Sequence, residues 1–294
     1  MADELCLTLP TSKWNIVLTT TLGLLISIIA STTNVLILTA IYKKPSLHTI
    51  TYYCLASLAV GDLFVGIVAL PLWITRSLLS IADEEHPLSV AVDCVYVLSV
   101  GTSTYNLCTV SLERYVGVVL PLRYNVIATR RRLQYAVTTV WVLSSSIACL
   151  RLVIDEDSYW LVAISTLIFF PEITISYCYV CIFKEASRQS RAIAQQSGFP
   201  SPVNQIQNRK ASLTIAIVIS VFYLTALPAL AFSIAELVSQ KQMSCEQKKS
   251  FESWGTWALF AAFSNAAINP WVYAARKSEF KGALKVLKIW NYVC

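Results

Sequence analysis

Long apolar stretches alternate with short polar segments along the chain, and each stretch is long enough to cross a bilayer. A spanning helix needs about 20 mostly apolar residues. Seven stretches meet this requirement, near residues 15–42, 49–76, 88–120, 133–154, 158–184, 209–238 and 252–275. No long run alternates apolar and polar residues with a period of two, which argues against an outer-membrane-type barrel. The pattern predicts an all-α membrane protein whose residues 15–275 form a seven-transmembrane helix bundle.

Several of these stretches contain isolated polar residues at membrane depth. They are Asn34, Asp62, Asn265, Asn269 and the pair Glu113-Arg114. Hydrocarbon penalises such groups, so they are rare there and mark functional positions. In the third stretch, polar and apolar residues recur with three-and-four spacing and share one helical face. That face includes Asp93, Tyr96, Val97, Val100, Ser103, Thr104 and Leu107, and it reaches Arg114 seven residues later.

Composition supports the membrane interpretation. The chain is 56% hydrophobic and 14% charged, and its mean hydropathy is +0.60. Soluble domains carry roughly 25% charged residues. A chain so poor in charge would expose a large apolar surface to water, so we expect a bilayer to be its solvent. Because no basic soluble domain is present, we expect no nucleic-acid partner.

The distribution of basic residues predicts the orientation, because cytoplasmic loops carry an excess of Lys and Arg. One set of helix ends is rich in them, as at Lys43-Lys44, Arg130-Arg131-Arg132 and Lys184 to Arg191. The opposite set carries fewer basic residues and also contains the acidic clusters Asp83-Glu84-Glu85 and Asp155-Glu156-Asp157. Its basic residues are Lys13, Arg76, Arg151, Lys241, Lys248 and Lys249. We therefore expect residues 1–14 outside the cell and the carboxyl terminus inside. Residues 276–294 alternate apolar and lysine positions, which predicts a membrane-surface helix and a cytoplasmic tail.

Nine cysteines are present, and four of them fall at or near the predicted outer side. Cys6, Cys94, Cys149 and Cys245 allow three pairings. A bridge from Cys6 to Cys245 would join two loops. Cys294 is a candidate for palmitoylation at the inner surface, with an ordinary terminal cysteine as the alternative.

The residues after the third stretch carry a family resemblance. Glu113-Arg114-Tyr115, followed by Pro121-Leu122, resembles the E/D-R-Y signature and second inner loop of rhodopsin-like (class A) G-protein-coupled receptors. The other stretches agree with that family in order. The matching residues are Asn34, Leu58-Ala59-Val60-Gly61-Asp62, Trp141, Pro171, Tyr179, Phe222, Pro228 and Asn269-Pro270-Trp271-Val272-Tyr273. The resemblance covers nearly the whole chain.

This resemblance implies a plasma-membrane receptor that binds an extracellular ligand and activates a heterotrimeric G protein. In the family, the sixth helix swings outward and opens an inner cleft. The residues implied in G-protein coupling and activation are Glu113, Arg114, Tyr115, Pro121, Leu122, Tyr179, Asn269, Pro270 and Tyr273. Those implied in transmission between ligand and cleft are Thr104, Pro171, Phe222 and Pro228.

The family also suggests an ion site. Asp62, Ser99, Ser103, Asn265 and Asn269 resemble the residues around an allosteric sodium ion. The alternative is a water-filled polar cluster with Asp62 protonated, since burial disfavours an unpaired carboxylate. No cofactor is required in either case.

The implied ligand pocket is mostly small and apolar. Its residues are Asp93, Tyr96, Val97, Val100, Ala163, Ala226, Ala229, Leu230, Ser233, Leu259 and Phe263. Tyr96 stands where amine receptors have aspartate, and Phe263 stands where opsins have the retinal lysine. Ala226 replaces a common tryptophan, which predicts a deeper pocket. We expect a lipid, a nucleoside-like molecule or a small peptide rather than a biogenic amine.

Two further departures refine the comparison. Ser89 stands where most relatives have a bridged cysteine, and the following outer loop is short. This resembles the melanocortin, lysophospholipid, cannabinoid and adenosine group of receptors, and the melanocortin members favour the pairing of Cys6 with Cys245. Asn208 replaces an acidic partner of the E/D-R-Y arginine, which predicts basal signalling because one charge-assisted contact is lost.

Other functions fit less well. Transporters tend to show paired halves with broken helices, and none are evident. A membrane hydrolase would need a metal or nucleophile constellation, yet the two histidines, His48 and His86, fall in loops on opposite sides. We therefore expect no enzyme activity. A seven-helix scaffold or dimer partner that does not signal remains an alternative.

Overall fold

The computed structural model describes residues 13–81, 83, 85–196, 221, 224–225, 227–232, 234–235 and 245–276. Every regular element in this part of the chain is helical. The longer helices are α2 (Lys13–Lys43), α3 (Ile50–Phe64), α4 (Leu70–Leu78), α5 (Pro87–Val119), α7 (Arg130–Cys149), α8 (Glu156–Ile164), α9 (Phe170–Gln196) and α11 (Cys245–Arg276). The shorter turns are η1 (Pro45–Leu47), η2 (Val65–Ala69), η3 (Pro121–Arg123), α6 (Tyr124–Ile127), η4 (Leu150–Leu152) and η5 (Ser165–Phe169).

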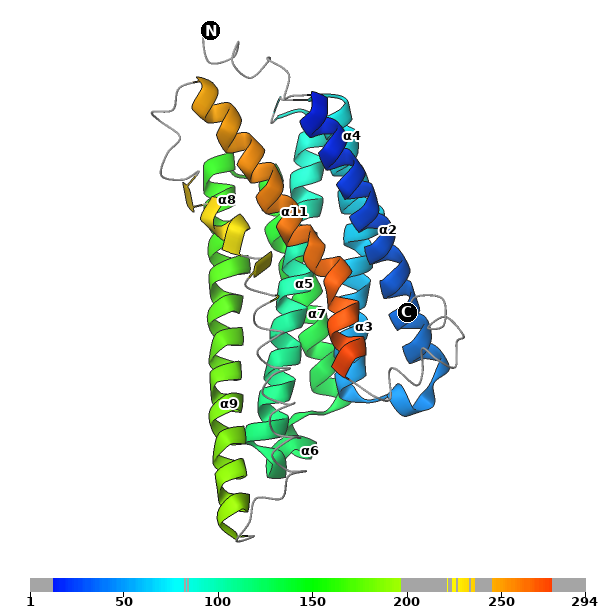
Figure 1. The fold of residues 1–294 in the computed structure, drawn as a ribbon, viewed down its shortest axis with the longest axis vertical. Helices are drawn as coiled ribbons and strands as arrows, with labels where there is room; N and C mark the ends of the chain where they lie inside the picture. The colour runs from blue at the N-terminus through cyan, green and yellow to red at the C-terminus, as the bar shows by residue number, and fades with distance from the viewer. Residues whose placement is uncertain are drawn as a thin grey trace.

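The helices stand side by side along the long axis of the molecule (Figure 1). Within the described residues, five helical segments are long and apolar enough to cross a membrane. They correspond to the first five predicted spans. The helix α11 coincides with the seventh, whereas most of the predicted span 209–238 and residues 277–294 lie outside the described residues.

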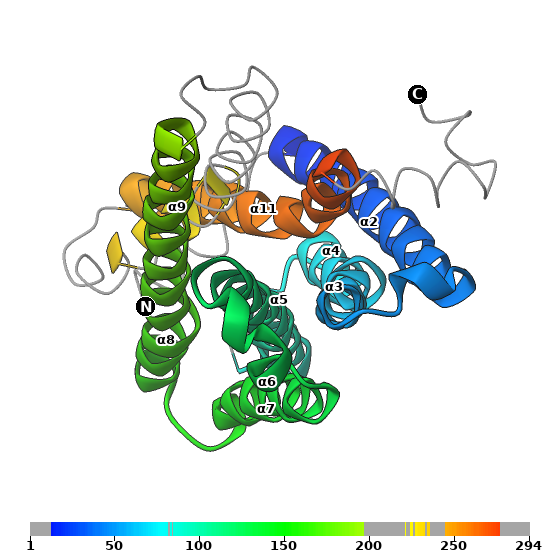
Figure 2. The same ribbon diagram turned by 90° about the horizontal axis from the view of Figure 1, so that it is seen from below.

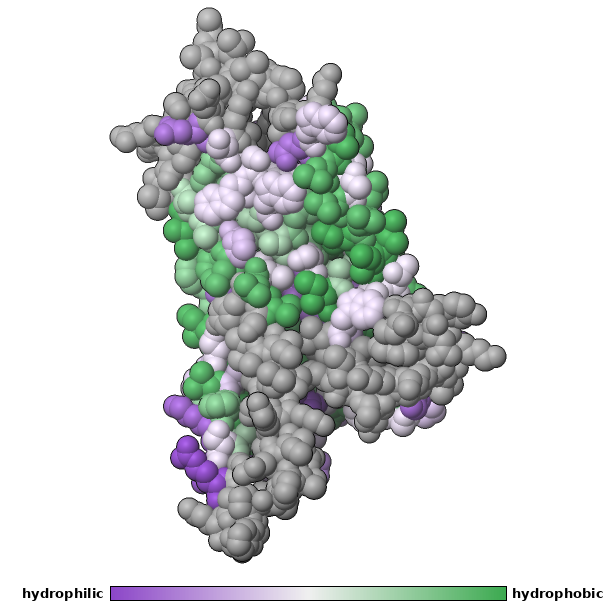
Figure 3. Space-filling view, viewed as in Figure 1, coloured by the Kyte–Doolittle hydropathy of each residue, from purple (hydrophilic) through white to green (hydrophobic). Residues whose placement is uncertain are grey.

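The helix α5 lies at the centre of the bundle. It packs against α3, α7 and α9, and these helices surround it in the end-on view of Figure 2. The outward faces carry exposed apolar side chains, such as Ile28 and Ile29 on α2 and Ile173 and Val180 on α9. In Figure 3 the hydrophobic surface covers the upper part of the bundle, and hydrophilic residues gather at the lower end of α9. This division fits a bilayer around the apolar part.

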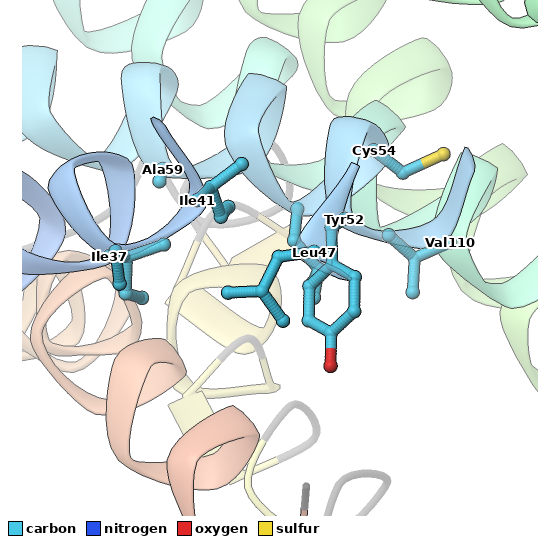
Figure 4. Packing of buried hydrophobic residues seen from close by; sticks show 9 residues of the cluster. Ile37, Ile41, Leu47, Tyr52, Cys54, Ala59 and Val110 are labelled. Atoms are coloured by element: carbon cyan, nitrogen blue, oxygen red, sulfur yellow. The ribbon is translucent and has the colours of Figure 1, made fainter. Parts of the chain in front are cut away.

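An apolar cluster fixes the ends of α2 and α3 against α5. Leu47 of η1 is completely buried, and it packs with Ile37 and Ile41 of α2 and Tyr52 of α3 (Figure 4). Val110 of α5 belongs to the same cluster. The short connection between α2 and α3 is therefore anchored in the bundle.

Two prolines each follow a widened, π-helical turn. A proline has no N–H to donate, and its ring clashes with the carbonyl one turn earlier in an α-helix. In η2, the N–H of Leu70 donates to the carbonyl of Val65, so the carbonyl of Gly66 faces Pro71 and receives nothing from it. The hydroxyl of Ser27 on α2 donates to this carbonyl at 2.6 Å.

The second π turn repeats the arrangement. In η5 the same register pairs the carbonyl of Thr166 with Pro171, which has no donor. The hydroxyl of Tyr105 on α5 donates to this carbonyl at 2.9 Å. Backbone groups freed in a membrane helix must be satisfied by neighbouring helices or water. Each proline thus ties its own helix to a neighbour.

Gly66 also permits a close approach between η2 and α2. A Cβ atom at this position would lie 2.5 Å from the hydroxyl oxygen of Ser31 and 2.9 Å from the carbonyl oxygen of Ser27. Only glycine leaves room for these atoms. The hydrogen bond from Ser27 therefore depends on the glycine within the widened turn.

The hydroxyl of Tyr105 is therefore expected to stabilise the fold. Tyr105→Phe should lower the free energy of unfolding by about 1–3 kcal/mol, because a buried carbonyl loses its donor. Thermal unfolding of the purified protein in detergent measures the change. Tyr135→Phe is the matched control, since Tyr135 is 66% exposed. Equal melting temperatures for the two variants would contradict the role of Tyr105.

Candidate functional site

A buried carboxylate joins three helices near the middle of the bundle. Asp62 of α3 is 1% exposed. The hydroxyl of Ser103 on α5 donates to its Oδ1 at 2.8 Å, and the side-chain amide of Asn269 on α11 donates to its Oδ2 at 2.9 Å. Nearby, Asn34 of α2 donates to the carbonyl of Ala266 on α11 at 3.0 Å. Polar residues far apart in the sequence therefore meet in one buried network.

The predicted sodium residues divide into two groups. Asp62, Ser103 and Asn269 are in direct contact. Ser99 is completely buried and donates to the carbonyl of Val95 on its own helix at 2.7 Å. Ser99 and Asn265 both line an adjacent cavity of about 60 Å³, which Ser103 also borders. Carboxylate, hydroxyl and amide oxygens are suitable ligands for a hard cation, so this set fits a sodium ion.

The same cavity extends to residues predicted for the ligand pocket. Tyr96, Val100, Ala229 and Phe263 line it, and the rings of Tyr96 and Phe263 meet edge to face with centroids 5.5 Å apart. The predicted ion and ligand residues therefore border one space. Its further lining residues are Val65, Thr104, Leu167, Ile168, Glu172, Thr225, Ala262 and Ala266.

Other residues predicted for the ligand pocket have different surroundings. Val97 and Ala163 do not themselves line the cavity, and they pack in an apolar cluster with Tyr105, Val140 and Tyr159. Their small apolar side chains suit this packing. Leu259 packs against a second apolar cluster, and Leu230 is buried. Of the remaining two, Ala226 and Ser233, nothing is described.

Asp93 has a structural partner. Its Oδ2 lies 3.3 Å from Nε of Arg151, which follows α7 and is 5% exposed. The guanidinium also reaches Oε1 of Glu85 at 3.4 Å, and the hydroxyl of Tyr159 donates to the carbonyl of Asp93 at 3.5 Å. Sequence reasoning took Arg151 for an ordinary outer basic residue. The pairing makes Asp93 a structural residue rather than an open anion of the pocket.

The outer end of α5 is held without a disulfide. Ser89 stands at the position where most relatives have a bridged cysteine. It is completely buried, and its hydroxyl donates to the carbonyl of Asp83 at 2.7 Å. Cys94 and Cys149 are free thiols. The ion pair of Arg151 and Asp93 therefore connects η4 to α5 where a covalent bridge would otherwise do so. The predicted bridge from Cys6 to Cys245 lies outside the described side chains.

The next outer turn is stabilised by a capping residue. Asp155 begins α8, and its carboxylate accepts a hydrogen bond from the backbone N–H of Ser158 at 2.9 Å. Hydrogen bonds from Ser158 hold the pKa of the Asp155 carboxyl below its ordinary value. A side-chain acceptor at this position satisfies one of the free N–H groups at the helix start.

At the cytoplasmic end of α5, Arg114 is held by its neighbour. Its Nε donates to Oε2 of Glu113 at 2.7 Å, and its guanidinium also contacts the hydroxyl of Thr51 on α3. Oε1 of Glu113 accepts hydrogen bonds from Thr51 at 2.8 Å and from Tyr124 of α6 at 2.6 Å. Burial and the contact with Glu113 raise the pKa of Tyr124. The arginine is thus held within its own helix and toward α3.

The other residues predicted for G-protein coupling have varied surroundings. The ring of Tyr115 lies 6.3 Å from that of Tyr177 on α9. Leu122, next to Pro121 in η3, is 97% exposed. Tyr179 is buried against Leu107 and Ile175. Pro270 lies inside α11. Of the side chains of Tyr273, Phe222 and Cys294 nothing is described, whereas Pro228 lies in a described helical segment.

Comparison with known proteins assigns the family. Residues 33–273 match the model of the 7 transmembrane receptor (rhodopsin family). The chain therefore belongs to this family, and it is a multi-pass membrane receptor rather than an enzyme. The match begins within α2 and ends within α11, and it includes Asp62, Ser103 and Asn269.

Individual relatives are distant but match over most of their length. Melanocortin receptor 4 of Danio rerio is 25% identical over 276 residues, which is 92% of this chain and 83% of that receptor. Melanocortin receptor 5 of Bos taurus is 25% identical over 89% of this chain and 81% of its own. Adenosine receptor A2b of Bos taurus is 26% identical over 88% of this chain and 86% of its own. The predicted likeness to the melanocortin and adenosine group is confirmed.

The buried ion pair generates a prediction about stability. Arg151→Met should lower the free energy of unfolding by about 3–5 kcal/mol, because it leaves Asp93 buried without its charge partner. The double variant Arg151→Met with Asp93→Leu should recover much of the loss. Melting temperatures of the four proteins in the cycle measure the coupling. Additive effects of the two substitutions would contradict the pairing.

Proposed function

We propose that the chain is a seven-helix receptor that binds an extracellular ligand and activates a heterotrimeric G protein. Family membership supports the receptor class. The arrangement at the cytoplasmic end of α5 supports the transducer role, because a guanidinium held by Glu113 and Thr51 can be released when the helices rearrange. A partner helix would then reach Arg114 in the manner of helix-in-groove recognition. The amino terminus lies outside and the carboxyl terminus inside.

The proposed activation step is an outward movement of the sixth helix. Pro228 on that helix and Pro171 on α9 weaken the regular hydrogen bonding at positions where a helix can bend. A ligand that binds the open arrangement better than the closed one shifts the population toward it. Release of Arg114 from Glu113 accompanies the opening.

The proposed cation site is at Asp62. When bound, a sodium ion would neutralise the carboxylate and favour the closed arrangement of α3, α5 and α11. The residues that would hold it are Asp62, Ser103 and Asn269, with Ser99 and Asn265 on the cavity side. Direct hydrogen bonds to both oxygens of Asp62 support the placement.

The names of the relatives indicate two ligand classes. Melanocortin receptors are named for peptides, and adenosine receptors are named for a nucleoside. The small apolar cavity beneath Tyr96 and Phe263 agrees with a compact group entering from outside. A peptide or a nucleoside-like molecule is therefore the proposed ligand class, and a lipid is the remaining alternative.

Arg114 provides the direct test of G-protein coupling. In cells that express the receptor, Arg114→Gln should lower basal nucleotide exchange on the G protein at least tenfold at equal surface expression. The reason is that the guanidinium contacts the G protein only when the receptor engages it. Arg76→Gln, a change of the same residue type at the outer end of α4, is the control. Unchanged exchange in Arg114→Gln would refute the coupling role.

Asp62 tests the cation site separately. Replacing sodium by choline at constant ionic strength should raise basal activity in the parent protein, because the closed state loses its ion. In Asp62→Asn this difference should disappear, since the neutral side chain keeps its shape but holds no cation. The measurement is basal nucleotide exchange in membranes. A persistent sodium effect in the variant would exclude Asp62 as the site.

A further inference from the structure

Glu172 is an ionisable residue at membrane depth. It belongs neither to the proposed coupling site nor to the proposed sodium site. It follows Pro171 near the start of α9 and lines the cavity described above. Its Oε1 atom is buried and has no hydrogen-bond partner among the residues that the structure describes. Burying a carboxylate without a donor is unfavourable, and ionisable residues within the membrane generally mark functional sites. The carboxylate therefore requires a partner that enters the cavity.

The other buried carboxylates on the described helices already have partners. Asp62 accepts from Ser103 and Asn269. Asp93 is paired with Arg151. Glu113 is paired with Arg114. Glu172 differs because its Oε1 has no such partner among the described residues and its side chain lines the cavity.

Three of the hydroxyl groups that line the cavity already donate their proton to another oxygen of the protein. Ser99 donates to the carbonyl of Val95 at 2.7 Å, Ser103 donates to Asp62, and Thr104 donates to the carbonyl of Val100 at 2.6 Å. Each hydroxyl has one proton and two lone pairs. With the protons committed, the lone pairs remain for an occupant. The occupant that suits these oxygens and Glu172 is a donor or a cation.

The size of the cavity limits which chemical groups can bind in it. Its volume is about 60 Å³, whereas pockets for drug-sized ligands are about 300–1,000 Å³. It therefore accepts a head group rather than an entire ligand. An ammonium group has three donors and no acceptor, which complements a carboxylate beside hydroxyl lone pairs. The aromatic rings of Tyr96 and Phe263 border the same space and can attract a cation through their faces.

We propose that Glu172 binds a primary ammonium group of the extracellular ligand. The group belongs to a lysine side chain or to the amino terminus of a peptide. This inference rests on the proposed receptor function and specifies its ligand. It also explains how an ammonium group can bind although Tyr96 replaces an aspartate on α5, because the anion comes from α9 instead.

Binding to the purified full-length receptor tests this assignment without a G protein. Thermal unfolding is measured with benzylamine and 2-phenylethylamine and with the neutral alcohols of the same chain length. The amines should stabilise the parent protein at concentrations at least tenfold below those of the alcohols. A lysine-containing tetrapeptide and its Nε-acetylated form, both with an acetylated amino terminus, distinguish a peptide ammonium from a free amine.

Substitutions locate the ammonium. Glu172→Gln should raise the half-maximal amine concentration at least tenfold, because the neutral amide keeps the shape but loses the charge. Glu172→Asp should have a smaller effect and serves as a second variant if the amide variant is unstable. Glu185→Gln is the control, since Glu185 on the same helix pairs with Arg188. It should leave amine binding unchanged.

Three results would overturn the proposal. The first is equal stabilisation by amines and alcohols, or none by any amine or by the lysine peptide. The second is unchanged amine binding in Glu172→Gln. The third is stabilisation by sodium alone that is lost in Glu172→Gln, which would make Glu172 a metal-ion ligand. Because these measurements involve no transducer, their failure is distinct from a failure of G-protein coupling.

Discussion

The requirement that buried polar groups find partners inside the protein organises this structure. Hydrocarbon supplies no hydrogen bonds, so each group must be satisfied by its own or a neighbouring helix. Asp62 meets this requirement through Ser103 and Asn269, which brings α3, α5 and α11 together. The prolines follow the same rule. Their missing donors leave carbonyls that Ser27 and Tyr105 satisfy from adjacent helices.

These contacts connect α5 to several other elements of the bundle. Ser103, Tyr105 and Glu113 on α5 accept or donate hydrogen bonds across to α3, η5 and α6. Apolar packing is less selective, because lipid tails are as apolar as the side chains between helices. The polar contacts therefore specify which helices are neighbours, and the apolar clusters fill the space between them.

The apolar periodicity predicted the five described spans, and their positions agree with the helices found. The pairing of Asp62 with polar residues of other helices was also expected from its depth.

Other features needed three-dimensional information. Periodicity does not reveal the π turns, because the residues around Pro71 and Pro171 are apolar on nearly every side of the helix. Val97 was placed on the pocket face by its spacing, and its packing against residues of α7 and α8 was not visible in the sequence. Glu172 was overlooked, although a charged residue beside Pro171 in an apolar stretch was a usable signal.

Arg151 illustrates why charge counting alone misjudges such residues. On the positive-inside argument it was one of a few outer basic residues, and its burial was invisible in the sequence. Its partner Asp93 lies 58 positions earlier in the chain. The pair ties η4 to α5, so it serves the purpose of the absent disulfide by a different interaction. The strength of an ion pair depends on the exclusion of water, whereas a disulfide is a covalent bond. The contact between η4 and α5 therefore depends on the burial of Arg151, and substitutions that admit water there weaken it.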